Sequence, residues 1–250
     1  MKIESLLTNP TNCDTIDPST KVGNSSRITK ITPGVKNKNR LNIFVNDKFF
    51  CSLDISQLTD LKLKTGQILS QQELDQLKTA SNFGKLYTRA LEYILIRPRS
   101  QKEVQDYLKR KTLNRPIRTK NPKTREYQTK IQPGFDKSLI EPVLAQLSSK
   151  GYLNDQKFAT AWAQNRNQSK GISQKKLIIE LKRKGIATSI INQVLENTDR
   201  NDKTEIKKNI AKKRQRYDNQ KLAQYLLRQG FNYQDIQEAL SEEDSASFEA

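Results

Sequence analysis

The sequence predicts a mainly α protein of tandem three-helix repeats forming an elongated, curved array, with a small β element near the N-terminus. Three observations predict it. Hydrophobic residues make up only 34% of the 250 residues, which favours small stacked units over one thick core. A helical pattern recurs in the second half of the chain at a spacing of about 45 residues. Ahead of it, residues 27–53 show the apolar–polar alternation of short strands.

The first element in chain order is a tail. Residues 1–26 are rich in Asn, Thr, Ser and Pro and have no hydrophobic period, so we expect them to be disordered. The next segment, 27–82, is expected to be a small extension of strands and helices. Its alternation predicts three strands, at 27–32, 41–45 and 49–53.

Turn and cap signals complete this extension. Asn46 and Asp47 separate the last two strands, and either residue tolerates the positive φ of a tight hairpin. Asp54 is expected to cap a helix that carries Ile55, Leu58 and Leu61 on one face. A capping box at Ser70–Glu73 predicts a second helix, with Leu74 and Leu77.

Three later segments share one pattern: a polar cap, an apolar residue four positions on, and another four after that. They begin at Ser100, Ser173 and Asp218. The second and third copies end with a glycine, Gly185 or Gly230, which is typical of a left-handed helix end. Each has a helix before it and a helix after it, and the preceding helices are expected at 86–96, 157–168 and 205–216.

The first copy reaches its matching glycine, Gly134, only after a 22-residue insertion, 112–133. The insertion is basic and contains interior prolines, so we expect an exposed basic loop or hairpin. It is either a phosphate-tracking arm that orders on contact or an inert surface insertion. Its candidate binding residues are Arg118, Lys120, Lys123 and Arg125.

These signals divide the helical part of the chain. Residues 83–147 are expected to form repeat 1 with its insertion, 148–198 repeat 2, and 199–240 repeat 3. An acidic tail, 241–250, follows.

The net charge of +18 predicts a polyanionic partner, either nucleic acid or a protein polymer coated with it. Three basic runs lie in or near the repeats, two of them at equivalent positions, so they should form a rough stripe. Each run alone would read as a solvated helix face. The runs comprise Lys109, Arg110 and Lys111; Lys182, Arg183 and Lys184; and Lys212, Lys213 and Arg214.

Several chemistries are excluded by composition. The chain has no histidine, which removes His-based triads and His metal ligands, and two cysteines are too few for a Cys-only zinc site or a disulfide framework. Neither a Gly-rich phosphate loop nor an apolar run long enough to cross a membrane is present. We therefore predict no catalytic residue, metal or cofactor. Trp162 has the spacing of a core residue rather than of a base-stacking platform.

Three motifs carry a family resemblance. Residues 97–108, with Arg97, Arg99, Ser100 and Glu103, look like the R-x-R-S-x-x-E-L segment of the regulatory protein RecX family. The segments 151–159 and 171–186 resemble that family's G-Y-L-[DN]-D-x-x-F-A and G-x-x-x-[IL]-x-x-E-L-x-x-K-G-I segments. This sequence departs from the pattern at Pro98, in the insertion and in both tails.

The resemblance implies a non-catalytic, cytoplasmic regulator that binds the RecA recombinase filament on single-stranded DNA. It implies mostly inhibition of the RecA ATPase, strand exchange and coprotease activities, and hence a place in homologous recombination, DNA repair and the SOS response. We expect a monomer with no membrane partner, which meets single-stranded DNA directly or through the filament.

With this resemblance, the candidate contacts to the filament or its DNA are Arg97, Arg99, Arg166 and the basic runs of the first two repeats. An alternative role for Arg97 and Arg99 is structural, in which they cap and brace helices within the bundle. Two other functions stay open. The chain could be an autonomous nucleic-acid-binding protein, since three-helix units also build helix-turn-helix readers. It could also be a metal-dependent nuclease, for which Glu180 is the nearest candidate carboxylate.

Overall fold

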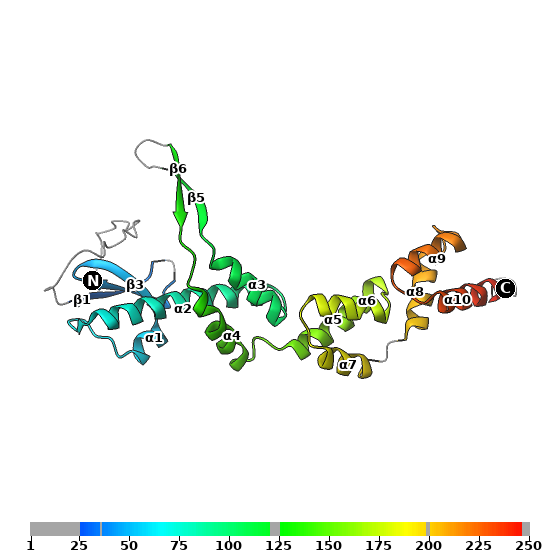
Figure 1. Ribbon diagram of the computed structural model, residues 1–250, viewed down its shortest axis with the longest axis horizontal. Coiled ribbons are helices and arrows are strands. Elements are labelled where there is room, and N and C mark those ends of the chain that lie inside the picture. Colours follow the sequence, from blue (N-terminus) through cyan, green and yellow to red (C-terminus); the bar gives the residue numbers. More distant parts are fainter. Residues whose placement is uncertain (1–25, 36, 121–125, 199–200, 247–250) are drawn as a thin grey trace, which may run out of the picture. The chain divides into compact units, whose positions relative to one another are not determined.

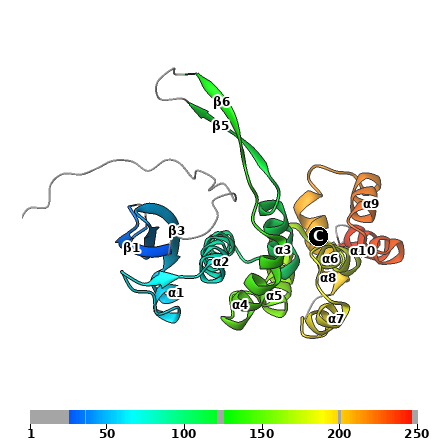
Figure 2. The same cartoon turned by 60° about the vertical axis from the view of Figure 1, so that its left-hand side comes forward.

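A computed structural model describes residues 26–35, 37–120, 126–198 and 201–246 (Figure 1). The expected disordered tail lies outside these residues, apart from Ser26. The chain divides into two compact units at the bond between Thr88 and Arg89. The first unit contains the sheet, and the second contains the repeats, which a second view shows from another side (Figure 2).

The first unit is built on a four-stranded antiparallel sheet of order β3-β2-β1-β4. The strands are β1 (Ser26–Pro33), β2 (Arg40–Val45), β3 (Lys48–Asp54) and β4 (Ile68–Leu69). Asn46 and Asp47 both take positive φ, 48° and 66°, which confirms the predicted tight hairpin. The sequence predicted three strands; β4 was missed because two residues are too few to show a period.

Short helix α1 (Ile55–Asp60) follows the sheet directly. Leu58 packs against the core of the first unit, whereas Ile55 and Leu61 are exposed. The predicted apolar face of this helix is therefore wrong, except for Leu58. Ser70 and Glu73 exchange hydrogen bonds as the capping box predicts, and Leu74 and Leu77 of the helix that follows join the core.

That helix, α2 (Gln71–Ile96), runs without a break where the sequence predicted two helices. Gly84 lies in its interior. A Cβ there would come within 2.7 Å of the Gln57 side chain, so the glycine permits α1 to lie close rather than breaking the helix. The helix ends just before Arg97 and Pro98, as predicted.

In the second unit the described regular elements are helices apart from one hairpin, which confirms the mainly α prediction. Its helices are α3 (Gln101–Lys111), η1 (Lys137–Leu139), α4 (Ile140–Ser149), α5 (Asp155–Lys170), α6 (Gln174–Arg183), α7 (Thr188–Glu196), α8 (Asp202–Lys213), α9 (Asn219–Arg228) and α10 (Tyr233–Ala246). The capped middle helices of the repeats are α3, α6 and α9.

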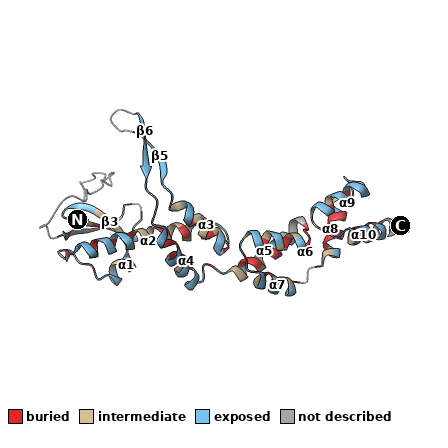
Figure 3. Ribbon diagram, in the orientation of Figure 1, coloured by how far each residue is buried: buried red, intermediate tan, exposed pale blue. Residues whose placement is uncertain are grey.

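The repeat pattern is confirmed by burial. The apolar pairs of the middle helices, four residues apart in each, are fully buried: Val104 and Leu108, Leu177 and Leu181, Leu222 and Leu226. Figure 3 shows buried residues on the helices of the second unit. Gly185 and Gly230 take φ of 80° and 86°, as a left-handed helix end requires.

Gly134 differs from these two glycines. Its φ does not lie in the left-handed region; instead it packs so tightly that a Cβ would overlap the Thr112 carbonyl. Gly134 therefore matches Gly185 and Gly230 in its position after the middle helix but not in its backbone conformation. Phe135 still follows the end of α3, because its backbone N–H donates to the Lys111 carbonyl (3.1 Å).

The insertion forms a hairpin of β5 (Arg115–Lys120) and β6 (Tyr127–Gln132), the second of the two forms expected. Both views show it extending away from the helices (Figures 1 and 2). At the other end of the unit, α10 continues to Ala246, into the segment predicted as an acidic tail. Glu242 there pairs with Lys207 at 2.7 Å, and residues 247–250 lie outside the described chain.

Candidate polyanion-binding surface

Two pairs of exposed cations occupy equivalent helix ends. Lys109 and Arg110 lie in the last turn of α3, and Lys182 and Arg183 lie in the last turn of α6. All four side chains are exposed. Cations in this turn also stabilise a helix, since they lie near the negative end of its dipole. The four residues are called the helix-end cations below.

The third residue of each run turns inward instead. The Lys111 ammonium lies 4.8 Å from the centre of the Tyr107 ring, and burial together with nearby arginines lowers its pKa. The Lys184 ammonium pairs with Glu103 at 2.6 Å and lies 4.9 Å from the Trp162 ring. Both lysines thus have intramolecular partners, and a contact to another molecule stays a prediction for them.

Arg97 and Arg99 have intramolecular partners as well. Arg97 pairs with Glu103 at 3.1 Å and donates to the Pro98 carbonyl. The Arg99 guanidinium lies 3.9 Å above the Tyr93 ring, which stacks on Tyr107 at 4.2 Å with an angle of 5° between the planes. These contacts favour the bracing alternative for both arginines.

Glu103 therefore connects α3 with two cations from different places in the chain. Partial burial acts to raise its pKa, but hydrogen bonds from Arg97 and Lys184 hold the pKa below its usual value. Since Lys184 belongs to the second repeat, this carboxylate ties the first two repeats together.

The repeats are also joined by hydrogen bonds from the N-cap serine of one middle helix to the C-terminal end of the next middle helix. Ser100, which caps α3, donates its hydroxyl to the Lys184 carbonyl at the end of α6 (2.7 Å). Ser173, which caps α6, does the same to the Gln229 carbonyl at the end of α9 (2.9 Å). The first helix of each following repeat adds one bond: Asp155 accepts from the Gln101 amide and Asp202 from the Gln174 amide.

The glycines of the helix ends make these junctions possible. A Cβ on Gly185 would lie 2.6 Å from Lys102, and a Cβ on Gly230 would lie 2.6 Å from the Ser173 hydroxyl. The two junctions thus repeat the same geometry and hold α3, α6 and α9 in a fixed order. They set the helix-end cations of repeats 1 and 2 in equivalent places.

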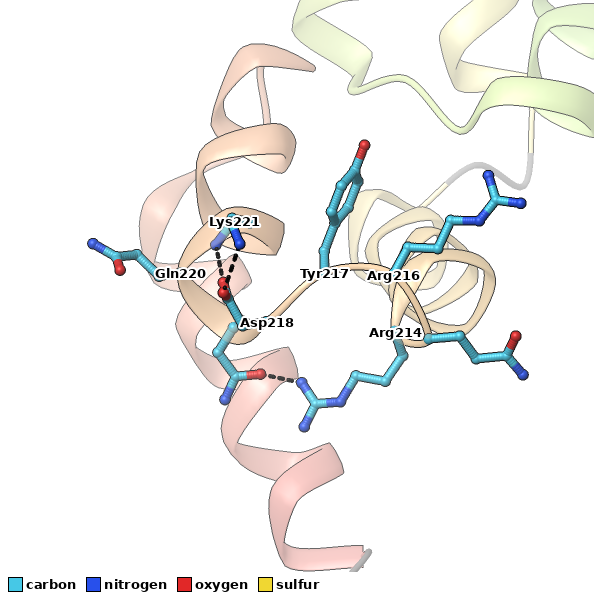
Figure 4. A pocket seen from close by; sticks show the side chains of 8 residues that line it. Arg214, Arg216, Tyr217, Asp218, Gln220 and Lys221 are labelled. Carbon is cyan, nitrogen blue, oxygen red and sulfur yellow. Dashed lines mark hydrogen bonds and ion pairs between the residues drawn. The ribbon is translucent and has the colours of Figure 1, made fainter.

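The third basic run lies on α8 and at its end, not on a middle helix. Lys212 is exposed, the Lys213 ammonium lies 5.3 and 4.5 Å from the centres of the Tyr217 and Tyr225 rings, and Arg214 donates to the Asn219 side chain. An open hollow lies at the connection between α8 and α9 and is lined by residues 214–221, which include Arg216 and Tyr217 (Figure 4).

On α9 itself, the positions that match Lys182 and Arg183 hold Leu227 and Arg228. Leu227 is exposed. The pair of helix-end cations is therefore found at two of the three middle helices.

The hairpin contributes the remaining candidates. The Arg118 and Lys120 cations each lie 6.0 Å from the centre of the Tyr127 ring. Lys123 and Arg125 lie outside the described residues. Arg166 lies on α5, but its side chain is also outside the described residues.

Sequence reasoning missed Tyr127, although the period of two along the insertion could have placed it with Arg118 and Lys120. It also missed Arg216 and Tyr217, for which the sequence offers no comparable signal.

Trp162 and Glu180 are partners in one intramolecular hydrogen bond. The tryptophan is partly buried against the core of repeat 2 and stacks on Phe158 at 5.6 Å, and its Nε1–H donates to Glu180 Oε2 (3.1 Å). The predicted packing role of Trp162 is thus supported. Within the described ranges, no group of three acidic or cysteine side chains is arranged to hold a metal ion. Nor does any helix there combine the length and apolarity that a membrane span needs.

Comparison with known proteins identifies the relatives of this chain. The family model for the regulatory protein RecX N-terminal domain matches residues 26–70, and the model for the RecX second three-helix domain matches residues 154–195. The regulatory proteins RecX of Bacillus licheniformis and Bacillus subtilis are each 30% identical to it. These alignments cover 87% and 86% of this chain and 77% and 76% of the relatives.

A solved structure shares the fold. A crystal structure of a regulatory protein RecX aligns with a TM-score of 0.64 and 21% identity, over 86% of this chain and 99% of that one.

Proposed function

Since the chain belongs to the RecX family of regulatory proteins, we propose that it binds the RecA recombinase filament on single-stranded DNA and modulates it, mostly by inhibition. The activities affected are the ATPase, strand exchange and coprotease functions of RecA. The protein acts in the cytoplasm as a monomer and without chemistry of its own.

One observation carries the proposal: exposed cation pairs at equivalent ends of two joined repeats. A nucleoprotein filament presents negative charge at regular intervals, and a surface with its own repeat can meet several of them at once. The contacts of Ser100 and Glu103 fix α3 and α6 relative to one another. The two pairs of helix-end cations are therefore held at a fixed spacing.

The test is ATP hydrolysis by RecA on single-stranded DNA, titrated with this protein below one copy per recombinase. The DNA is in excess, so competition for DNA cannot explain a loss of ATPase. The variant Lys182→Glu/Arg183→Glu should need at least about tenfold more protein for the same suppression, because reversed charges repel the filament. Lys184 is left unchanged, since its ammonium holds Glu103.

The matched control reverses two other exposed lysines, Lys137→Glu/Lys175→Glu, which lie outside the last turns of α3 and α6. It should suppress hydrolysis as the natural chain does, and both variants should keep the far-ultraviolet circular dichroism of the parent. Equal suppression by both variants would refute the role of the helix-end cations. Absence of suppression by the natural chain would refute the proposed function itself.

The hairpin favours a second function, autonomous binding of nucleic acid, because it carries exposed cations beside an aromatic ring. Tight, salt-sensitive binding to bare DNA together with no effect on RecA would select this function.

A further inference from the structure

The hairpin β5–β6 has two chemically different faces. In its register Lys120 pairs with Tyr127, Arg118 with Thr129, and Pro116 with Ile131. Directly paired residues of an antiparallel ribbon point to the same side, and so do residues two apart. One side therefore carries Arg118, Lys120, Tyr127 and Ile131; it is called the tyrosine face below.

The tyrosine face combines cations with an exposed aromatic ring. Arg118 and Lys120 flank Tyr127, each 6.0 Å from the ring centre, and 66% of Tyr127 is exposed. Ile131 is 72% exposed on the same side. Nucleic-acid phosphates bind such cations, and a base can stack on the exposed flat ring.

The opposite side lacks an aromatic residue among the paired positions. It carries Arg115, Ile117 and Lys130. The Arg115 guanidinium turns back to the helix, where it donates to the Arg110 carbonyl at 3.2 Å. Lys130 is thus a cation on the same ribbon that lies away from Tyr127, and it provides a control.

Internal packing does not account for the tyrosine face. All positions of β6 are exposed, and only Thr119 of β5 is half-buried (Figure 3). The base of the hairpin is nevertheless fixed, because Gly134 donates to the Asn114 side chain and Phe135 to the Lys111 carbonyl. An isolated two-stranded ribbon gains little stability from such exposed side chains. Its exposed residues are therefore available to a partner.

We propose that the tyrosine face binds single-stranded nucleic acid, with an unstacked base on the Tyr127 ring and phosphates beside Arg118 and Lys120. A single strand is the occupant because its bases expose the faces that a duplex keeps stacked. The contact is tolerant of sequence, since every base has such a face.

This inference deepens the proposed function by naming the segment that touches the strand. It rests on that function only for the statement that the strand is met inside a RecA filament. Binding to the bare strand can be measured without RecA, so the two proposals fail separately.

The experiment measures binding of the full chain to a fluorescein-labelled single-stranded oligonucleotide of mixed sequence, by anisotropy over a range of salt concentrations. Tyr127→Ala should weaken binding at least about fivefold, the lower range for loss of a stacking aromatic. Tyr127→Phe should bind as the natural chain does, because it keeps the ring.

Lys120→Gln and Lys130→Gln form the matched pair, since each removes one lysine charge from one side of the same ribbon. Lys120→Gln should lower the slope of log affinity against log salt by about 0.7, as expected when one phosphate contact is lost on a single strand. Lys130→Gln should leave that slope unchanged. A third readout is ultraviolet cross-linking of the same oligonucleotide carrying 5-iodouracil, which should label Tyr127.

The proposal is overturned if the natural chain does not bind the oligonucleotide at low salt, or if Lys120→Gln and Lys130→Gln behave alike. Equal affinity of Tyr127→Ala and the natural chain would also overturn it, as would preference for a duplex competitor over a single strand. Loss of strand binding in Tyr127→Ala, in a chain that never suppresses the RecA ATPase, would support this inference and refute only the proposed function.

Discussion

At the scale of single residues, opposite charges decide which cations are available. Glu103 holds both Arg97 and Lys184, so two residues chosen from the sequence as partner contacts have intramolecular partners. The sequence could show that these residues were basic. It could not show that a carboxylate 81 positions from Lys184 would pair with it, because that contact depends on the packing of two repeats.

The depressed pKa of Glu103 gives a pH-dependent prediction. A carboxyl whose folded-state pKa lies below its ordinary value of 4.5 contributes stability that is present above that value and is lost as the pH falls through the folded pKa. Glu103→Gln should therefore destabilise the second unit by about 1 kcal/mol at pH 7, a modest figure because the ion pairs are partly exposed.

The measurement is urea unfolding of the natural chain and of Glu103→Gln, followed by Trp162 fluorescence at pH 7 and near pH 3. The difference in free energy of unfolding should shrink as the pH is lowered, because protonation of the natural carboxyl removes its charge from the ion pairs. A difference that stays constant with pH would contradict the role of the charged pair.

At the scale of elements, helix ends rather than helix faces join the repeats. Gly185 combines a φ of 80° with contact to Lys102, whereas Gly151 has a φ of 75° and open space where a Cβ would point. Both replacements by alanine carry the cost of a left-handed backbone, about 1–2 kcal/mol. Only Gly185→Ala should also push the first two repeats apart.

Thermal unfolding should therefore show a clearly lower midpoint for Gly185→Ala than for Gly151→Ala. Native-state hydrogen exchange should locate the added loss of protection at the first turn of α3, beside the Ser100 hydroxyl bond. Equal midpoints and unchanged protection in both variants would show that the junction tolerates the extra methyl group.

Local pattern predicted the elements that depend on local residues. The caps at Ser70, Ser100 and Ser173, the hairpin turn at Asn46 and the buried pairs of the middle helices all follow from nearby spacing. The exceptions depend on distant residues: β4 exists through its pairing with β1, and Gly84 lies inside the unbroken α2 at a point where a Cβ would meet the Gln57 side chain.

The candidate site was predicted less completely. The basic runs were visible, but their division into exposed and inward residues depends on Tyr93, Tyr107 and Trp162, whose rings come from other helices or other turns. Tyr127 faces Lys120 only because the insertion pairs as a ribbon.

At the scale of the whole molecule, each compact unit has its own core and its own reporter. Cys51 lies in the core of the first unit, where burial raises the pKa of its thiol to about 11. Trp162, the single tryptophan, packs in the core of repeat 2 in the second unit. The two residues can therefore follow the two units separately in one sample.

In a Cys13→Ser chain, thiol labelling at pH 8 should be slow without denaturant, because only about one thiol in a thousand is ionised at that pKa and the residue is buried. As urea is raised, the midpoint for Cys51 labelling should differ from the midpoint for Trp162 fluorescence. Coincident midpoints would mean that the units unfold as one cooperative body.

The junction geometry has a consequence for how such chains can diverge in length. The ends of α6 and α9 each receive the serine cap of the preceding repeat, so extra residues there would separate neighbouring repeats. Among the described residues, no such cap reaches the end of α3, and that is where the hairpin emerges. Extra residues after α3 therefore leave both serine contacts in place, whereas extra residues at the end of α6 or α9 would break one of them.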